Sequence, residues 1–204
     1  MSTEKETRWE VIYGVTLAVA AALLGVGDMI GGNADNDQIA LINEKASAYQ
    51  WYQSKSIKET LVEAQGNLLG ALVESGAIAP DKAAAAQEQA NVLKGKAERY
   101  AKEKTEILLG SAAVGKENWV QDVDGTLGIV VGAKEYEAQV EALGNVADQF
   151  DMSGLLLQLS LVVGAIGLLL DEVRLKKYAY TGVVVLGLVG ACFFVYGLLL
   201  LQGT

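Results

Sequence analysis

Apolar residues along this chain are concentrated in three blocks, and a long polar stretch separates the first block from the second. The blocks cover residues 11–30, 152–170 and 178–201. Each is long enough to cross the hydrocarbon core of a bilayer, which takes about 20 apolar residues in an α-helix. The second and third contain no charged residue, and the first contains only Asp28. We therefore expect an all-α membrane protein with three transmembrane helices.

The alternation of polar and apolar segments divides the chain into six parts. We expect an N-terminal tail, a first transmembrane helix, a helical domain outside the membrane, a second transmembrane helix, a short basic loop and a third transmembrane helix. These parts cover residues 1–10, 11–32, 33–150, 151–170, 171–177 and 178–201, in that order. The first block is interpreted as an uncleaved signal anchor, because its apolar run is long and no A-x-A cleavage site follows it.

Helix signals predict three helices in the middle domain, which we expect to be coiled-coil-like. The sequence GGNADND after the first block predicts a helix stop followed by new N-caps. A turn at Ser75-Gly76 and the chain's single proline, Pro80, indicate where the next helix begins. The expected helices cover residues 36–74, 80–109 and 133–150, with a glycine-rich loop containing a short strand or helix at 110–132. No breaker separates the third helix from the second block, so the two are compatible with one long rod.

Apolar residues in these helices recur at alternating spacings of three and four, the pattern of a coiled-coil seam. In the second and third helices the seam positions are Ala83, Ala86, Ala90, Leu93, Ala97, Tyr100, Lys104 and Ile107, and then Ala133, Tyr136, Val140, Leu143, Ala147 and Phe150. In the first helix they are Ile39, Ile42, Ala46 and Tyr49, and after a one-residue shift Ile57, Leu61, Ala64, Leu68 and Leu72. Alanine buries little area, so these seams require a second layer or a partner chain.

The shift lies in the segment richest in aromatic residues, Tyr49-Gln50-Trp51-Tyr52-Gln53-Ser54-Lys55-Ser56-Ile57-Lys58. This segment resembles the signature W-x-Y-Y-Q-x-K-S-I-K of a bacterial domain-of-unknown-function family, the one numbered 4337. The family's layout of one membrane helix, a helical middle and two C-terminal membrane helices is similar to the layout expected here. Tyr49 stands where the family usually has tryptophan, and Trp51 where it usually has tyrosine. The resemblance implies a bacterial membrane protein and brings no established activity.

The motif has two interpretations. In one, it is a recognition patch whose aromatic rings and two cations bind a partner's carboxylates or lipid phosphates. In the other, its aromatic rings pack between helices and its lysines are solvated. The candidate patch consists of Tyr49, Trp51, Tyr52, Gln53, Lys55 and Lys58.

Composition narrows the classes of function. The net charge of −9 argues against a nucleic-acid partner. The chain has no histidine and one cysteine, Cys192, which we interpret as a buried apolar filler in the third block. We therefore expect no enzyme, no cofactor and no metal site. Asp28 is the one candidate ion or proton ligand within an apolar block, and a hydrated carboxylate at the membrane interface is the alternative.

Cations in the short flanking segments predict the orientation in the membrane. Lys5 and Arg8 lie in the N-terminal tail, and Arg174, Lys176 and Lys177 lie in the loop between the second and third blocks. The positive-inside rule therefore places both segments in the cytoplasm. We expect a protein of the bacterial inner membrane whose middle domain and C-terminus are periplasmic or otherwise extracytoplasmic.

Small residues spaced by four predict close packing of membrane helices. They are Gly14, Ala18 and Ala22 in the first block and Gly187 and Ala191 in the third. In the second block, Gln158 and Ser160 are expected to hydrogen-bond between helices. A second set of apolar residues in the middle domain requires cover from a neighbour: Leu41, Leu69, Val73, Val92 and Leu108. We therefore expect the lipid bilayer and further copies of the chain as partners, although packing within one chain also explains the small residues.

Three functions fit these features. The first is a self-assembling structural or scaffold protein of the membrane, which we favour. The second is a channel, transporter or accessory subunit that uses Asp28 and polar positions in the bundle. The third is an envelope sensor or adaptor whose middle domain binds a protein partner of unknown identity.

Overall fold

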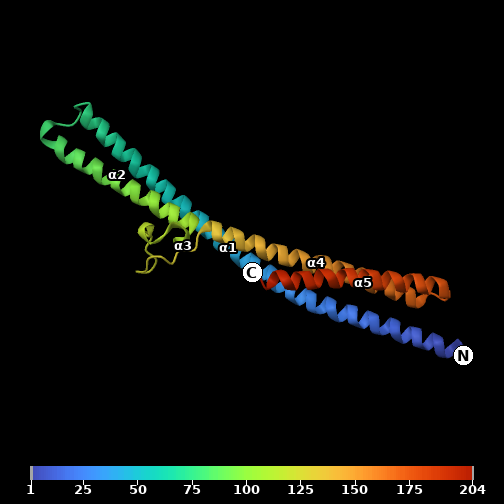
Figure 1. Cartoon of the computed structure of the whole chain (residues 1–204). Helices are drawn as coiled ribbons and strands as arrows, with labels where there is room; N and C mark the ends of the chain where they lie inside the picture. Colours follow the sequence, from blue (N-terminus) through green and yellow to red (C-terminus); the bar gives the residue numbers. More distant parts are fainter. Residues whose placement is uncertain (1, 204) are drawn as a thin grey trace. The chain divides into compact units, whose positions relative to one another are not determined.

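The computed structural model describes the backbone of residues 2–203 and the side chains of residues 9–203. Its helices are α1 (Ser2–Glu74), α2 (Pro80–Leu109), α3 (Ser111–Val114), the 3-10 helix η1 (Lys116–Asn118), α4 (Ala133–Leu169) and α5 (Val173–Leu201), as Figure 1 shows. Within residues 2–203, the extended pairing is limited to a single bridge between Val123 and Thr126. The side chains of Lys5 and Arg8, which contribute to the predicted orientation, lie outside the described residues.

The chain divides into two compact units. Unit 1 contains residues 1–40 and 139–204, and unit 2 contains residues 41–138. Three helices are long and apolar enough to cross a membrane, namely α1 from Trp9 onward, α4 and α5. The membrane-spanning parts predicted from the sequence therefore all fall on helices, and their apolar blocks belong to unit 1.

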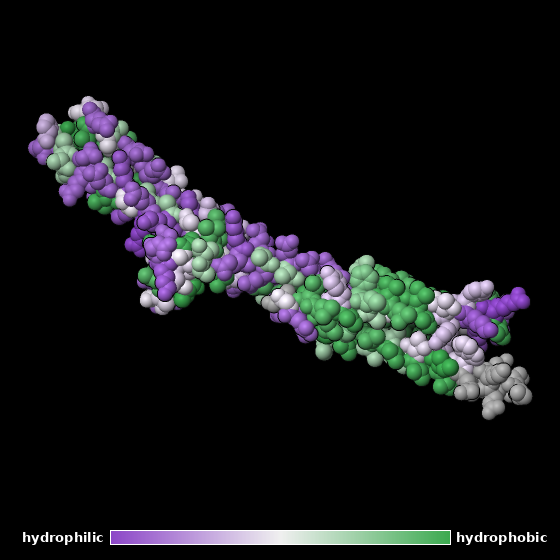
Figure 2. Space-filling model, viewed as in Figure 1, coloured by the Kyte–Doolittle hydropathy of each residue, from purple (hydrophilic) through white to green (hydrophobic). Residues whose placement is uncertain are grey.

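Unit 1 is a bundle of the N-terminal part of α1, the C-terminal part of α4, and α5 (Figure 1). Phe150 of α4 and Phe194 of α5 form its aromatic centre, with ring centroids 5.6 Å apart in an edge-to-face arrangement. Two buried serines of α4 hydrogen-bond to carbonyl oxygens of α5: Ser153 to Gly190 over 2.9 Å and Ser160 to Val183 over 3.0 Å. The bundle's visible surface over α4 and α5 is strongly hydrophobic, and hydrophilic residues gather near the α4–α5 turn (Figure 2).

The helix stop predicted at GGNADND is wrong, because α1 continues through it without a break. Gly31 is buried there, and a Cβ atom added to it would lie 2.9 Å from the Cβ atom of Phe150. Gly27 likewise faces the ring of Phe194. The glycines therefore make room for aromatic rings from α4 and α5, and this packing outweighs their low helix propensity.

The remaining helix limits agree closely with the sequence analysis. The helix predicted at 80–109 is α2, and α4 carries the third helix of the middle segment into the second apolar block as one rod. The helix that carries the third apolar block, α5, starts at Val173 and so includes most of the basic loop.

Unit 2 is a hairpin of α1 and α2 that buries a different face of α1 from the one predicted. Along this part of α1, buried and half-buried positions recur at alternating spacings of three and four: Leu41, Lys45, Ala48, Tyr52, Lys55, Glu59, Val62, Gly66, Leu69 and Val73. The predicted apolar seam from Ile57 to Leu72 is exposed. The seam positions predicted on α2 and α4 are all buried or half-buried. The error on α1 arose because the buried face includes lysine and glutamate, which sequence reasoning assigns to the surface.

Candidate interaction surfaces

Two ion pairs join α1 to α2 inside the hairpin of unit 2. The ammonium of Lys55 pairs with the carboxylate of Glu103, whose side chain is only 3% exposed. Arg99 binds the other oxygen of Glu103, with an Nε–Oε1 distance of 2.7 Å. The Lys55 ammonium also lies 5.7 Å from the centre of the Tyr100 ring, within the range of a cation–π contact. The Glu103 charge is therefore neutralised from both helices.

The second pair has the opposite polarity. Lys104 of α2 pairs with Glu59 of α1, and its ammonium lies 5.9 Å from the centre of the Tyr52 ring. Hydrogen bonding to Glu59 raises the pKa of Lys104 above its usual value, and the negative charge of Glu59 adds to the effect against the opposing effect of burial. The two pairs thus cross the seam with opposite polarity, since the lysine belongs to α1 in one pair and to α2 in the other.

The structure splits the motif at residues 49–58 between two environments. Tyr52 and Lys55 face α2, and Tyr49 and Trp51 are half-buried. Gln53 and Lys58 are exposed. The two lysines therefore do not share one surface, because Lys55 is already paired while Lys58 is solvated. Recognition of a partner through these residues stays a prediction, and their packing role is visible in the contacts.

The apolar residues that were predicted to form the seam form an exposed stripe on α1 of unit 2. The apolar stripe consists of Ile57, Leu61, Leu68 and Leu72, and Ile42 is also exposed but lies one position out of its register. Ile57, Leu61 and Leu68 are 69%, 56% and 62% exposed. Of the second set of apolar residues, Leu41, Leu69 and Val73 lie on the buried side instead, while Val92 is exposed. Within unit 2, the described residues therefore leave the apolar stripe of α1 uncovered.

Small residues in unit 1 are also distributed unequally. Gly14, Ala18 and Ala22 are exposed, and a Cβ atom at Gly14 would meet no atom within 4 Å. Gly187 and Ala191 are half-buried, and a Cβ atom at Gly187 would lie 3.6 Å from the Ser160 hydroxyl of α4. The stripe on α5 therefore contributes to packing within the chain, whereas the small-residue face of α1 remains open.

Three single-residue expectations in unit 1 have different outcomes. Cys192 is exposed on α5, so its prediction as a buried filler is wrong. Ser160 bonds to α5 as expected, but Gln158 is exposed. Asp28 is exposed, next to Gly154 of α4, and its role as an ion ligand stays a prediction. Among the described residues, no group of three or more histidine, cysteine, aspartate or glutamate side chains is arranged to hold a metal ion.

Sequence reasoning missed Glu106, which is fully buried and organises the loop at 110–132. Its carboxylate accepts hydrogen bonds from the Ser111 hydroxyl over 2.7 Å and from the backbone N–H groups of Val120 and Gln121 over 2.9 and 2.8 Å. Ser111 in turn accepts a bond from the N–H of Val130. The one sequence feature that could have indicated its burial is its position, since Glu106 directly precedes the seam residue Ile107. A buried carboxylate with these donors is a structural anchor for the loop.

A family model described as a domain of unknown function (DUF4337) matches residues 9–200. No curated protein and no solved structure matches the chain.

Proposed function

The chain belongs to the DUF4337 family, whose description names no activity, and we propose that it is a non-enzymatic scaffold protein of the bacterial inner membrane that assembles with copies of itself. In this proposal the three apolar helices of unit 1 cross the bilayer. Unit 2 lies outside the membrane and supplies the main contact between copies.

The observation that carries this proposal is the apolar stripe of unit 2. Four large aliphatic side chains are exposed along one face of a helix. Complete burial of each is worth about 1.5–3 kcal/mol, so a surface of this kind is favourable only when something covers it. The ion pairs of the hairpin seam supply register and little net stability, which adds to the need for an apolar contact elsewhere.

A second copy of the chain is the partner that fits the stripe. Copies anchored in one bilayer share their orientation and are concentrated in two dimensions, so a modest contact is sufficient for association. Leu61 and Leu68 are separated by one heptad, the repeat that lets identical helices pair in parallel. The exposed small residues Gly14, Ala18 and Ala22 offer the same neighbour a close approach within the bilayer. Closed rotational symmetry is the form expected of such an assembly.

The test is the mass of the purified protein in native nanodiscs. The wild-type chain is expected to form a discrete oligomer. Leu61→Glu with Leu68→Glu is expected to shift the population to monomer, because each change places a charge in the contact. Thr60→Glu with Asn67→Glu is the matched control, since both residues are exposed and each lies one position before a mutated leucine, about 100° around the helix from it.

Two outcomes separate the parts of this proposal. A wild-type monomer across lipids and detergents contradicts self-assembly and leaves the channel and adaptor functions. An oligomer that survives the stripe variant but is lost on changing Gly14, Ala18 and Ala22 to leucine moves the interface into the membrane helices.

The orientation is proposed from the cations of the α4–α5 turn and the N-terminal tail. A reporter phosphatase that is active only in the periplasm, fused near Ala85, is expected to be active, and the same reporter near Lys176 inactive. The reverse result places unit 2 in the cytoplasm and contradicts the orientation without affecting self-assembly.

A further inference from the structure

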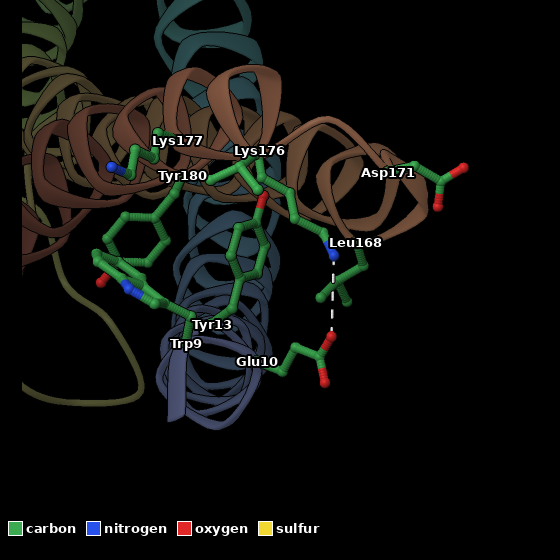
Figure 3. Close-up of a pocket in the computed structure, with 9 residues that line it drawn as sticks. Trp9, Glu10, Tyr13, Leu168, Asp171, Lys176, Lys177 and Tyr180 are labelled. Atoms are coloured by element: carbon green, nitrogen blue, oxygen red, sulfur yellow. Dashed lines mark ion pairs between the residues drawn. The ribbon is translucent and has the colours of Figure 1, made fainter. Parts of the chain in front are cut away.

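A cavity of about 220 Å³ lies in unit 1, where α4 ends and α5 begins. It is lined by aromatic, aliphatic and charged side chains from all three helices of the bundle (Figure 3). The lining residues used below are Trp9, Glu10, Tyr13, Leu168, Lys176 and Tyr180. A space of this size holds several water molecules, which suits a small polar group.

The aromatic wall of the cavity is built from α1 and α5. The Tyr180 ring packs against Trp9 with centroids 5.7 Å apart, edge to face, and against Tyr13 with centroids 5.3 Å apart. Tyrosine and tryptophan are the residues that concentrate where apolar chains meet headgroups in a bilayer. The cavity also lies at the ends of the apolar blocks of α1, α4 and α5, which corresponds to headgroup depth if the helices span.

Tyr13 carries the unexplained polar group. The residue is only 4% exposed, and its hydroxyl has no hydrogen-bond partner among the described residues. Gly167 of α4 makes room for this hydroxyl, because a Cβ atom there would collide with it. In Figure 3 the hydroxyl points toward the backbone end of Lys176, and the ammonium of that lysine extends away from it to Glu10. A buried hydroxyl usually has a hydrogen-bond partner, so we expect a ligand atom that accepts a hydrogen bond from Tyr13.

Of the four charged residues that line the cavity, Glu10 and Lys176 form a loose pair, and the other two are Asp171 and Lys177. The ammonium of Lys176 lies 3.8 Å from the carboxylate of Glu10, which is too long for a hydrogen bond. Both groups therefore keep bonding capacity for a ligand. The ammonium of Lys176 suits a phosphate, and the carboxylate of Glu10 suits a ligand ammonium that donates N–H bonds.

We propose that this cavity binds the headgroup of a phospholipid with a primary ammonium, of the ethanolamine class. Its phosphate accepts bonds from Tyr13 and Lys176, and its ammonium donates to Glu10. The acyl chains then lie along the apolar surface of the bundle, beside Leu168. The inference rests on the membrane insertion included in the proposed function and does not depend on self-assembly.

The experiment is native mass spectrometry of the full-length protein in mild detergent, with ethanolamine, glycerol and choline phospholipids of identical acyl chains at equal concentration. The wild-type protein is expected to retain the ethanolamine lipid in preference to the other two. Tyr13→Phe is expected to weaken retention roughly tenfold, the effect of losing one bond to a charged group. Glu10→Gln is expected to remove the preference for ethanolamine over choline, because the choline headgroup has no N–H to donate.

Tyr178→Phe is the matched control, since Tyr178 is exposed and outside the cavity. Equal retention of the three lipids by the wild-type protein, or a Tyr13→Phe variant that behaves like Tyr178→Phe, overturns the proposal. If free phosphoethanolamine stabilises the protein as much as the ethanolamine lipid does, the cavity binds a soluble phosphate ester instead.

Two further readouts keep this result separate from the proposed function. Extraction of the protein from membranes by alkaline carbonate contradicts membrane insertion. A monomeric mass with the ethanolamine lipid still retained contradicts self-assembly alone and leaves the lipid site standing.

Discussion

The two stretches of α1, one in each unit, bury positions that continue the same three-four spacing, but the buried residues differ in chemical character. In unit 1 the buried face is apolar and small, as at Ala20, Gly27 and Gly31, and it receives aromatic rings from α4 and α5. In unit 2 the buried face includes Lys55 and Glu59, which pair with residues of α2. Three-four spacing therefore continues along the helix while the interaction that fills it changes from close packing to ion pairing.

The outward faces complete the comparison. Unit 1 exposes Val15, Val19 and Val26 in a segment apolar enough to lie in a bilayer. Unit 2 exposes an apolar stripe beside polar neighbours, where lipid is not the expected cover. An apolar face thus indicates a surface that is shielded from water. It does not indicate whether the same chain, the bilayer or a second copy of the chain covers that surface.

The largest effect is expected from breaking the buried pair of unit 2. Lys55→Met leaves Glu103 buried with Arg99 as its remaining charged partner, and we expect the hairpin to lose about 2–3 kcal/mol of stability. Adding Glu103→Leu is expected to restore most of it, because a buried ion pair and an apolar pair are often nearly equivalent. Native-state hydrogen exchange of α2 amides measures both. Lys58→Met is the control, one turn away and solvated, and an equal loss there would contradict the assignment.

A smaller effect is expected from filling a glycine of unit 1. Gly31→Ala forces a methyl group against Phe150, and overpacking of this kind costs about 1–2 kcal/mol. The adjacent Gly32 has no atom within 4 Å of its Cβ position, so Gly32→Ala is expected to stabilise the helix by about 0.5–1 kcal/mol. Resistance to unfolding in mixed detergent micelles compares the two variants. If both variants change stability in the same direction, the close approach of Gly31 to Phe150 does not determine the stability of this segment.

The smallest effect concerns the second ion pair at high pH. The pKa of Lys104 is raised in the folded chain, so its contribution is complete below the unfolded value of 10.5 and is lost as the pH rises through the higher folded pKa. Burial likewise raises the pKa of Tyr136, with the charges of Glu44 and Glu135 adding to it, and this destabilises the fold in the same alkaline range. Lys104→Met is expected to lower stability by less than about 1 kcal/mol at pH 8 and to flatten part of its decline above pH 10.5. Chemical denaturation at several pH values tests this, and an unchanged decline would contradict the assignment to Lys104.

The sequence by itself determined the helical class, the apolar blocks and most helix limits. Block length and hydropathy are local quantities, and so are the turn signals at Ser75-Gly76 and Pro80, which correctly placed the end of α1 and the start of α2. The seam of α2 was also visible, because its alanines and Tyr100 alternate in a polar helix. Spacing alone was sufficient wherever the buried face was also the apolar face.

Only the tertiary structure decided which face of α1 is buried, whether GGNADND ends the helix, and which polar groups are buried. Each of these depends on a partner distant in sequence. Gly31 remains helical because Phe150 lies against it, and Lys55 is buried because Glu103 neutralises it. Glu106 is buried because the loop at 110–132 brings three donors to its carboxylate. Propensity and hydropathy describe a residue in its own segment, whereas burial of glycine and charge is set by what the rest of the fold places opposite them.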